Sequence, residues 1–258
     1  MGKELDRLIK IVTRLRGPKG CPWDREQTHK SLQSSLLDET YEFFEAAEDN
    51  DDQKMCEELG DLLLQVVLHA RIAAERRTFS LEDVAAGISE KLIRRHPHVF
   101  GSVKVKSSDE VLRNWEKIKK EEKKHCRKYL VDDIPDAMPA LFRAEKMQRR
   151  VARVGFDWKD IRPVFAKVVE EFNEFKRALA HRSRKEAEKE FGDILFALVN
   201  VARHHHICAE DALRAATRKF ARRFRYIEDR FAEQGKDLHK ATLRQMDRFW
   251  EESKKVVG

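Results

Sequence analysis

The stretch LLDETYEFFEAAEDNDDQKMCEELGDLLLQVVLHA, residues 36–70, decides the fold of this chain. Glu39 and Glu42 stand three residues apart on one predicted helix, and Glu58 and Asp61 stand three apart on a second, whose following turns are almost wholly apolar. Residues three apart share a helix face. Four carboxylates converging between two packed helices would repel one another unless cations lay among them, so the stretch predicts a helix pair around a hard divalent ion such as Mg²⁺.

The same pattern returns in VVEEFNEFKRALAHRSRKEAEKEFGDILFALVNVA, residues 168–202. Glu171, Glu174, Glu190 and Asp193 each lie 132 residues after the corresponding carboxylate of the first stretch. One such pair of motifs would indicate only a solvated helix face, but two copies with identical spacing are not expected by chance. The sequence therefore predicts an all-α chain made by internal duplication, with domains at residues 1–128 and 129–258.

Each half continues with a basic helix and a tryptophan. These are Lys91, Arg94, Arg95 and Trp115 in the first half and Lys219, Arg222, Arg223 and Trp250 in the second. The basic residues could be ordinary helix-end cations, and the tryptophans could be core residues. Together with the carboxylates, however, they suit a nucleoside polyphosphate, whose phosphates bind cations and whose base stacks on an aromatic ring. The charged run at residues 116–128 is predicted to be an exposed helical connection between the domains.

Composition narrows the class of protein. The 258 residues are 41% hydrophobic and 38% charged, with 10 Gly and 6 Pro, which is typical of a helical globular protein. The net charge of +7 would suit nucleic acid, a membrane surface or a small polyanion without choosing among them. No apolar run long enough to span a bilayer and no signal peptide is found, so a cytoplasmic protein is expected. Four scattered cysteines without CxxC spacing argue against a zinc site or a disulfide framework.

Phosphate-binding loops of the GxxxxGK[ST] and GxGxxG types are absent from the sequence. Instead, the chain carries an EExxE motif, a spacer and an ExxD motif, formed by Glu170, Glu171, Glu174, Glu190 and Asp193. It also contains HPHVF at 96–100 and RVGFDW at 153–158. With these motifs it closely resembles the MazG family of nucleoside triphosphate pyrophosphohydrolases. The resemblance spans essentially the whole chain. It implies two tandem MazG-like domains with four-helix cores, Mg²⁺ dependence with Mn²⁺ as a substitute, and hydrolysis of NTPs and dNTPs to nucleoside monophosphate and pyrophosphate in nucleotide-pool housekeeping. It also implies a homodimer, and neither a membrane nor a nucleic-acid partner is expected.

The resemblance places the main catalytic unit in the C-terminal half. It implies catalytic metal ligands at Glu171, Glu174, Glu190 and Asp193, and nucleotide contacts at Lys167, Glu170, Glu171, Glu186, Lys189, Lys219, Arg222, Arg223 and Trp250. Glu171 is the candidate for orienting the attacking water. A second site is expected at Glu39, Glu42, Glu58 and Asp61. Its nucleotide binding is expected to be weaker, because the first half has Ser35 at the position of Lys167 and His96 at the position of Phe224.

Two other functions stay open at this point. A regulator that binds nucleic acid or protein with the same fold, and has lost catalysis, would suit the pI near 9.2 and the basic runs. A pyrophosphohydrolase restricted to one abnormal or deoxy nucleotide would differ only in base selection. Within the helices, Gly60 predicts the close approach of another helix, and consecutive His204, His205 and His206 point in different directions, which argues against one metal site there.

Overall fold

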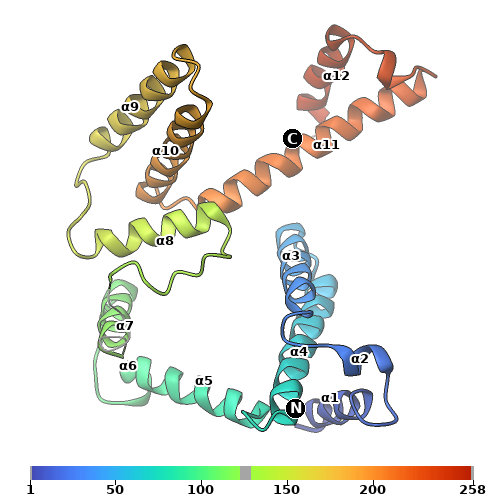
Figure 1. The fold of residues 1–258 in the computed structure, drawn as a ribbon, viewed down its shortest axis with the longest axis vertical. Helices are drawn as coiled ribbons and strands as arrows, with labels where there is room; N and C mark the ends of the chain where they lie inside the picture. The colour runs from blue at the N-terminus through green and yellow to red at the C-terminus, as the bar shows by residue number, and fades with distance from the viewer. Residues whose placement is uncertain (1, 123–128, 257–258) are drawn as a thin grey trace. The chain divides into compact units, whose positions relative to one another are not determined.

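The computed structural model describes residues 2–122 and 129–256 and divides the chain into two compact units, residues 1–124 and 125–258 (Figure 1). Every regular element of these described residues is a helix, which confirms the predicted all-α fold. The predicted domain boundary after residue 128 and the end of the predicted connection at 116–128 fall on residues 123–128, outside the described residues. The earlier part of that connection is helical, because it belongs to the helix Ser108–Glu122.

The N-terminal unit is organised around its two carboxylate-bearing helices. Its helices are α1 (Gly2–Leu15), α2 (Pro22–Glu26), α3 (Gln33–Asp49), α4 (Asp52–Glu75), α5 (Leu81–Arg95), α6 (Pro97–Phe100) and α7 (Ser108–Glu122). Helices α3 and α4 pack along each other, and α1 packs on α4. Val12, Leu32 and Ile72 belong to the buried cluster that joins α1, the start of α3 and the end of α4. The apolar turns that follow Asp61 in the sequence thus provide the core that holds the pair in place.

The C-terminal unit repeats this helix pair. Its elements are α8 (Ala140–Ala152), α9 (Ile161–Ala180), α10 (Arg184–His204), α11 (Ala209–Glu233), the short 3-10 helix η1 (Leu238–Lys240) and α12 (Leu243–Val256). Helices α9 and α10 pack along each other, α8 packs on α10, and α12 folds back on α11. Ile227, Phe231 and Phe249 form the buried cluster between α11 and α12. Both predicted carboxylate pairs therefore lie on paired helices.

The turn between the paired helices is conserved in geometry but not in residue type. Asn50 and Arg182 have left-handed backbones, with φ of 55° and 53° respectively. The next residues, Asp51 and Ser183, cap α4 and α10 by accepting a hydrogen bond from a backbone amide of the first turn. Asn tolerates a left-handed φ better than Arg does, so the second turn is built from a less suitable residue. Each turn aligns its two helices so that the carboxylates face one another.

The two halves differ beyond the helix pair. Helix α5 ends at Arg95 and a short helix starts at Pro97, whereas α11 continues from Ala209 to Glu233. Proline has no amide hydrogen and clashes with the carbonyl four residues earlier, which explains the break that the sequence predicts at Pro97. Position 225, which corresponds to Pro97 by the 128-residue spacing of the basic residues, is Arg225. One long helix in the C-terminal half therefore replaces two in the N-terminal half.

The described residues also bear on three smaller expectations. A Cβ built at Gly60 would meet no atom within 4 Å outside its own helix, so the prediction that Gly60 marks the close approach of another helix is wrong for this chain. Cys21, Cys56 and Cys208 carry free thiols, and Cys126 lies outside the described residues. Across the described parts of the chain, we find no helix that combines the length and the apolar character needed to cross a membrane.

Candidate active site

Three carboxylates converge between α9 and α10. Glu171 and Glu174 from α9 and Glu190 from α10 each offer an oxygen, and these oxygens lie within 4.8 Å of one another. Glu190 Oε2 is buried and has no hydrogen-bond partner among the described residues. An orphaned carboxylate oxygen beside two further carboxylates is a donor set that suits a hard divalent cation, so these residues fit the predicted metal. Asp193, one turn further along α10, is about half exposed and lies outside this group.

Two lysines neutralise the C-terminal cluster. Lys167 Nζ lies 2.6 Å from Glu171 Oε1 and 2.9 Å from Glu170 Oε1. Lys189 Nζ lies 3.0 Å from Glu190 Oε1 and 3.7 Å from Asp193 Oδ2. Hydrogen bonds to Glu171 and then to Glu170 hold the pKa of Lys167 well above its usual value, and the hydrogen bond to Glu190 raises the pKa of Lys189. Both ammonium groups therefore stay charged and supply positive charge among the carboxylates.

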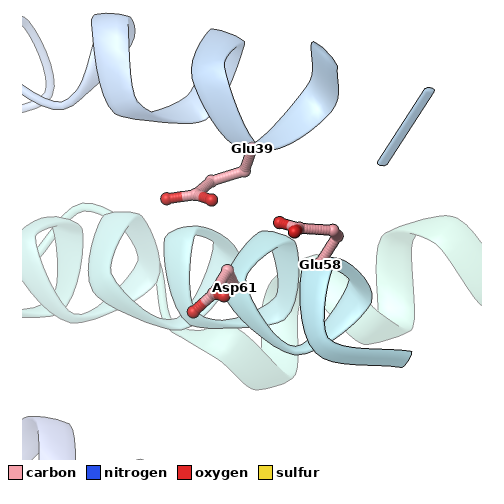
Figure 2. Close-up of side chains that lie close together, drawn as sticks. All are labelled: Glu39, Glu58 and Asp61. Carbon is pink, nitrogen blue, oxygen red and sulfur yellow. The ribbon is translucent and has the colours of Figure 1, made fainter. Parts of the chain in front are cut away.

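The N-terminal cluster uses a different set of three. Figure 2 shows Glu39 reaching from α3 toward Glu58 and Asp61 on α4, and their ligand oxygens lie within 4.8 Å of one another. Glu42, the fourth predicted ligand, is not part of this group. Burial, followed by the charge of Asp61, raises the pKa of Glu39. Burial, followed by the charge of Glu42, raises the pKa of Glu58. This cluster therefore holds mutually repelling carboxylates, which also suits a divalent cation.

The basic residues of α11 meet the tryptophan of α12. The Arg223 guanidinium lies over the Trp250 ring, 5.8 Å from its centre, and the Phe220 ring packs on Trp250 at 5.2 Å. Arg223 Nε is buried without a hydrogen-bond partner among the described residues, and Lys219 and Arg222 are exposed beside it. This surface, which we call the basic arm, suits an anion joined to an aromatic group. Sequence reasoning missed Phe220, although it lies three residues before Arg223 and therefore shares its helix face.

The predicted nucleotide contacts divide between two places in the C-terminal unit. Lys167, Glu170, Glu186 and Lys189 lie on α9 and α10 with the carboxylates, and Glu186 stands in the first turn of α10. Lys219, Arg222, Arg223 and Trp250 form the basic arm on α11 and α12. Helix α12 folds back on α11, and in Figure 1 it lies apart from the α9–α10 pair. The two groups of predicted contacts therefore stand on different helix pairs.

The loop that carries Trp158 is anchored to the end of α10. Arg203 makes two hydrogen bonds to the Asp157 carboxylate, at 2.9 Å and 2.5 Å, and His204 Nε2 lies 3.1 Å from the same group. The hydrogen bonds from Arg203 lower the pKa of Asp157, so the anchor is an ion pair at neutral pH. The sequence predicts no role for His204, and here it helps to position the loop.

The chain is similar to known proteins over both helix pairs. The MazG nucleotide pyrophosphohydrolase domain matches residues 27–100 and 161–227, which include both helix pairs. A Thermotoga maritima protein named nucleoside triphosphate pyrophosphohydrolase/pyrophosphatase MazG is 45% identical over 96% of this chain and 95% of its own length. The Escherichia coli K12 nucleoside triphosphate pyrophosphohydrolase is 45% identical over 98% of this chain and 97% of its own length. YabN, an uncharacterized Bacillus subtilis protein, is 48% identical over 98% of this chain but only 52% of its own length. With two matched domains and relatives aligned from end to end, the chain belongs to the MazG nucleotide pyrophosphohydrolase family.

Proposed function

We propose that this chain is a Mg²⁺-dependent nucleoside triphosphate pyrophosphohydrolase that acts on NTPs and dNTPs and releases nucleoside monophosphate and pyrophosphate. The observation that carries this proposal is the convergence of Glu171, Glu174 and Glu190 on a helix pair that lies within the matched domain. The names of the two full-length relatives support the reaction. Housekeeping of the cytoplasmic nucleotide pool is the role we propose for this reaction.

The carboxylates are the proposed metal ligands. Glu171, Glu174 and Glu190 would hold Mg²⁺, or Mn²⁺ in its place, with Asp193 joining from the next turn of α10. A bound ion would activate a water and offset the charge that develops on the phosphates. Glu171 is the proposed residue that orients the attacking water, because it is the most deeply buried carboxylate of the three.

The lysines have a second proposed partner. Lys167 and Lys189 are bound to carboxylates in this structure, so a cation that takes over those oxygens would free their ammonium groups for phosphate oxygens. The Lys167 side chain is 39% exposed and the Lys189 side chain is 72% exposed, which leaves both room to turn. The basic arm would bind the remaining phosphate charge, and Trp250 would stack on the base.

A second copy of the chain is the proposed cover for the exposed apolar face of the α9–α10 pair. The basic arm and the carboxylates stand on different helix pairs, and the α9–α10 pair exposes large apolar side chains to solvent. Val169 is 59% exposed, Phe191 is 50% exposed and Phe172 is 45% exposed. Exposed apolar surface of this kind is typical of an interface. We therefore propose a homodimer, whose mass light scattering would detect.

Pyrophosphate release from a panel of NTPs and dNTPs with Mg²⁺ tests the proposed reaction. Glu174→Gln is expected to lower turnover by about a thousandfold, because loss of a metal ligand removes several kcal/mol of transition-state stabilisation. The matched change Glu42→Gln in the N-terminal half is expected to leave most activity. No release by the unaltered protein would contradict the proposal and favour a binding regulator, and equal loss in both variants would contradict the placement in the C-terminal half.

A further inference from the structure

Glu122 on α7 holds both arginines at the end of α5. Arg94 Nε donates to Glu122 Oε1 at 2.6 Å, and Arg95 donates to Glu122 Oε2 from Nε at 3.0 Å and from Nη2 at 2.5 Å. The Glu122 and Arg95 side chains are 19% and 13% exposed. The contact joins residues 27 and 28 positions apart on different helices, so it is not a local helix-surface pair.

The arginines that Glu122 holds correspond to those of the basic arm. Arg94 and Arg95 lie 128 residues before Arg222 and Arg223, and each half stacks its second arginine on a tryptophan. Arg95 lies 5.6 Å from the centre of the Trp115 ring, and Arg223 lies 5.8 Å from that of Trp250. The two halves therefore build the same arginine–tryptophan unit.

The two arginine–tryptophan units differ in the carboxylate that neutralises their arginines. No carboxylate contacts Arg223 among the described residues, and its Nε has no hydrogen-bond partner there. By the 135-residue spacing of the two tryptophans, the position that corresponds to Glu122 is Val257, which lies outside the described residues and carries no charge. An acidic side chain is thus present at this position in one half and absent from the other.

We propose that the arginine–tryptophan unit of the N-terminal half is a polyphosphate-binding site that Glu122 fills from within the chain. The two carboxylate oxygens take the place of phosphate oxygens between the guanidinium groups of Arg94 and Arg95. This inference rests on the proposed function, because that proposal assigns phosphate binding to the corresponding arginines. It adds Glu122 to Ser35 and His96 as a cause of weaker triphosphate binding in the N-terminal half.

A competing anion, rather than a change of pH, is what would displace the Glu122 carboxylate from the arginines. Hydrogen bonds from Arg95 and then Arg94 lower the pKa of Glu122 to about 2, so this group stays ionised under physiological conditions. A triphosphate carries several negative charges where Glu122 carries one, but it must displace a group that is already tethered beside the arginines. Because a tethered competitor acts at a high effective concentration, the site is expected to open when the carboxylate is removed.

Calorimetric titration of the full-length chain with inorganic tripolyphosphate tests this inference. The unaltered protein is expected to bind one tripolyphosphate per chain, and Glu122→Gln is expected to bind two, the second within about tenfold of the first in affinity. The matched control is Glu121→Gln, which removes the same charge from an exposed neighbour. Adding Arg95→Ala to Glu122→Gln is expected to abolish the second binding event.

The outcomes separate this inference from the proposed function. Glu122→Gln with unchanged stoichiometry, and with helix content and unfolding midpoint like those of the unaltered protein, would overturn the inference. A site gained in Glu122→Gln when the unaltered protein binds none would support the inference and contradict the phosphate role of the basic arm. If Glu122→Gln unfolds, Glu122→Asp serves instead, because it keeps the charge but shortens the side chain by one methylene. This variant is expected to show a second, weaker binding event. A folded Glu122→Asp variant without that event would overturn the inference.

Discussion

The two carboxylate clusters come from corresponding positions of one duplicated helix pair, but they balance their charge differently. In the C-terminal half, Lys167 and Lys189 contact the carboxylates directly. In the N-terminal half, the corresponding residues are Ser35 and Glu57, and the pKa values of Glu39 and Glu58 are raised instead. The carboxylates were kept in both copies while the cations beside them diverged. A metal site and a phosphate site are therefore separable properties of this fold.

The largest effect expected from this comparison is on turnover. Lys167→Met should lower pyrophosphate release by about 10- to 100-fold, because a charge-assisted hydrogen bond to phosphate contributes about 1.5–3 kcal/mol. Ser35→Met, at the corresponding position of the N-terminal half, should change turnover little. Steady-state rates with saturating Mg²⁺ measure both variants. Equal rates in Lys167→Met and the unaltered protein would show that Lys167 serves only to neutralise Glu171.

Smaller effects are expected on stability without metal, and they have opposite signs in the two clusters. Glu39→Gln should raise the unfolding midpoint by a few degrees, because it removes one charge from a cluster of repelling carboxylates. Glu171→Gln should lower the midpoint, because it removes the partner of Lys167. Thermal unfolding in a metal chelator compares the two. Midpoints that move in the same direction would contradict the difference in charge balance.

The raised pKa of Glu39 adds a pH dependence to this test. A carboxyl whose folded-state pKa lies above its unfolded value binds protons more tightly when folded, so its cluster gains stability as the pH falls through that folded pKa toward the unfolded value. Glu39→Gln should therefore show a weaker gain on mild acidification than the unaltered protein.

The smallest effect is expected from a histidine pair of the N-terminal half, whose counterparts by the 132-residue spacing are Ile161 and Val201. His29 Nδ1 and His69 Nδ1 lie 2.8 Å apart, and burial followed by the charge of His29 lowers the pKa of His69. The stability that depends on neutral His69 is present above its unfolded pKa of about 6.5 and is lost as the pH falls through the folded value. His69→Val, which installs the residue found at Val201, should flatten this loss. Unfolding midpoints between neutral and mildly acidic pH measure it, and an unchanged slope would contradict the role of His69.

Much of the fold was predictable because its signals are local. The helix pairs, their apolar turns and the break at Pro97 follow from residue spacing and from the chemistry of proline. The membership of each cluster was not predictable. Glu174 joins one group while its counterpart Glu42 does not, and Asp61 joins the other while Asp193 does not. Such differences depend on side-chain rotamers and small helix rotations, which spacing does not specify.

Contacts between distant segments were also beyond sequence reasoning. Glu122 lies within a long charged run, where any of several carboxylates could have faced the arginines, and only the packing of α7 on α5 selects it. His29 and His69 are 40 residues apart, and nothing in either local sequence marks them as partners. The carboxylates that converge between α9 and α10 were among those predicted, but the contact between Glu122 and the arginines was not.

The packing of consecutive helices has a consequence for how the chain folds. Helices α3 and α4, α9 and α10, and α11 and α12 are neighbours both in sequence and in space. Little loop-closure entropy is lost when such pairs form, so fast folding is expected from a topology of low contact order. Each copy of the duplicated unit carries these short-range contacts itself. Each half is therefore expected to fold without waiting for the other.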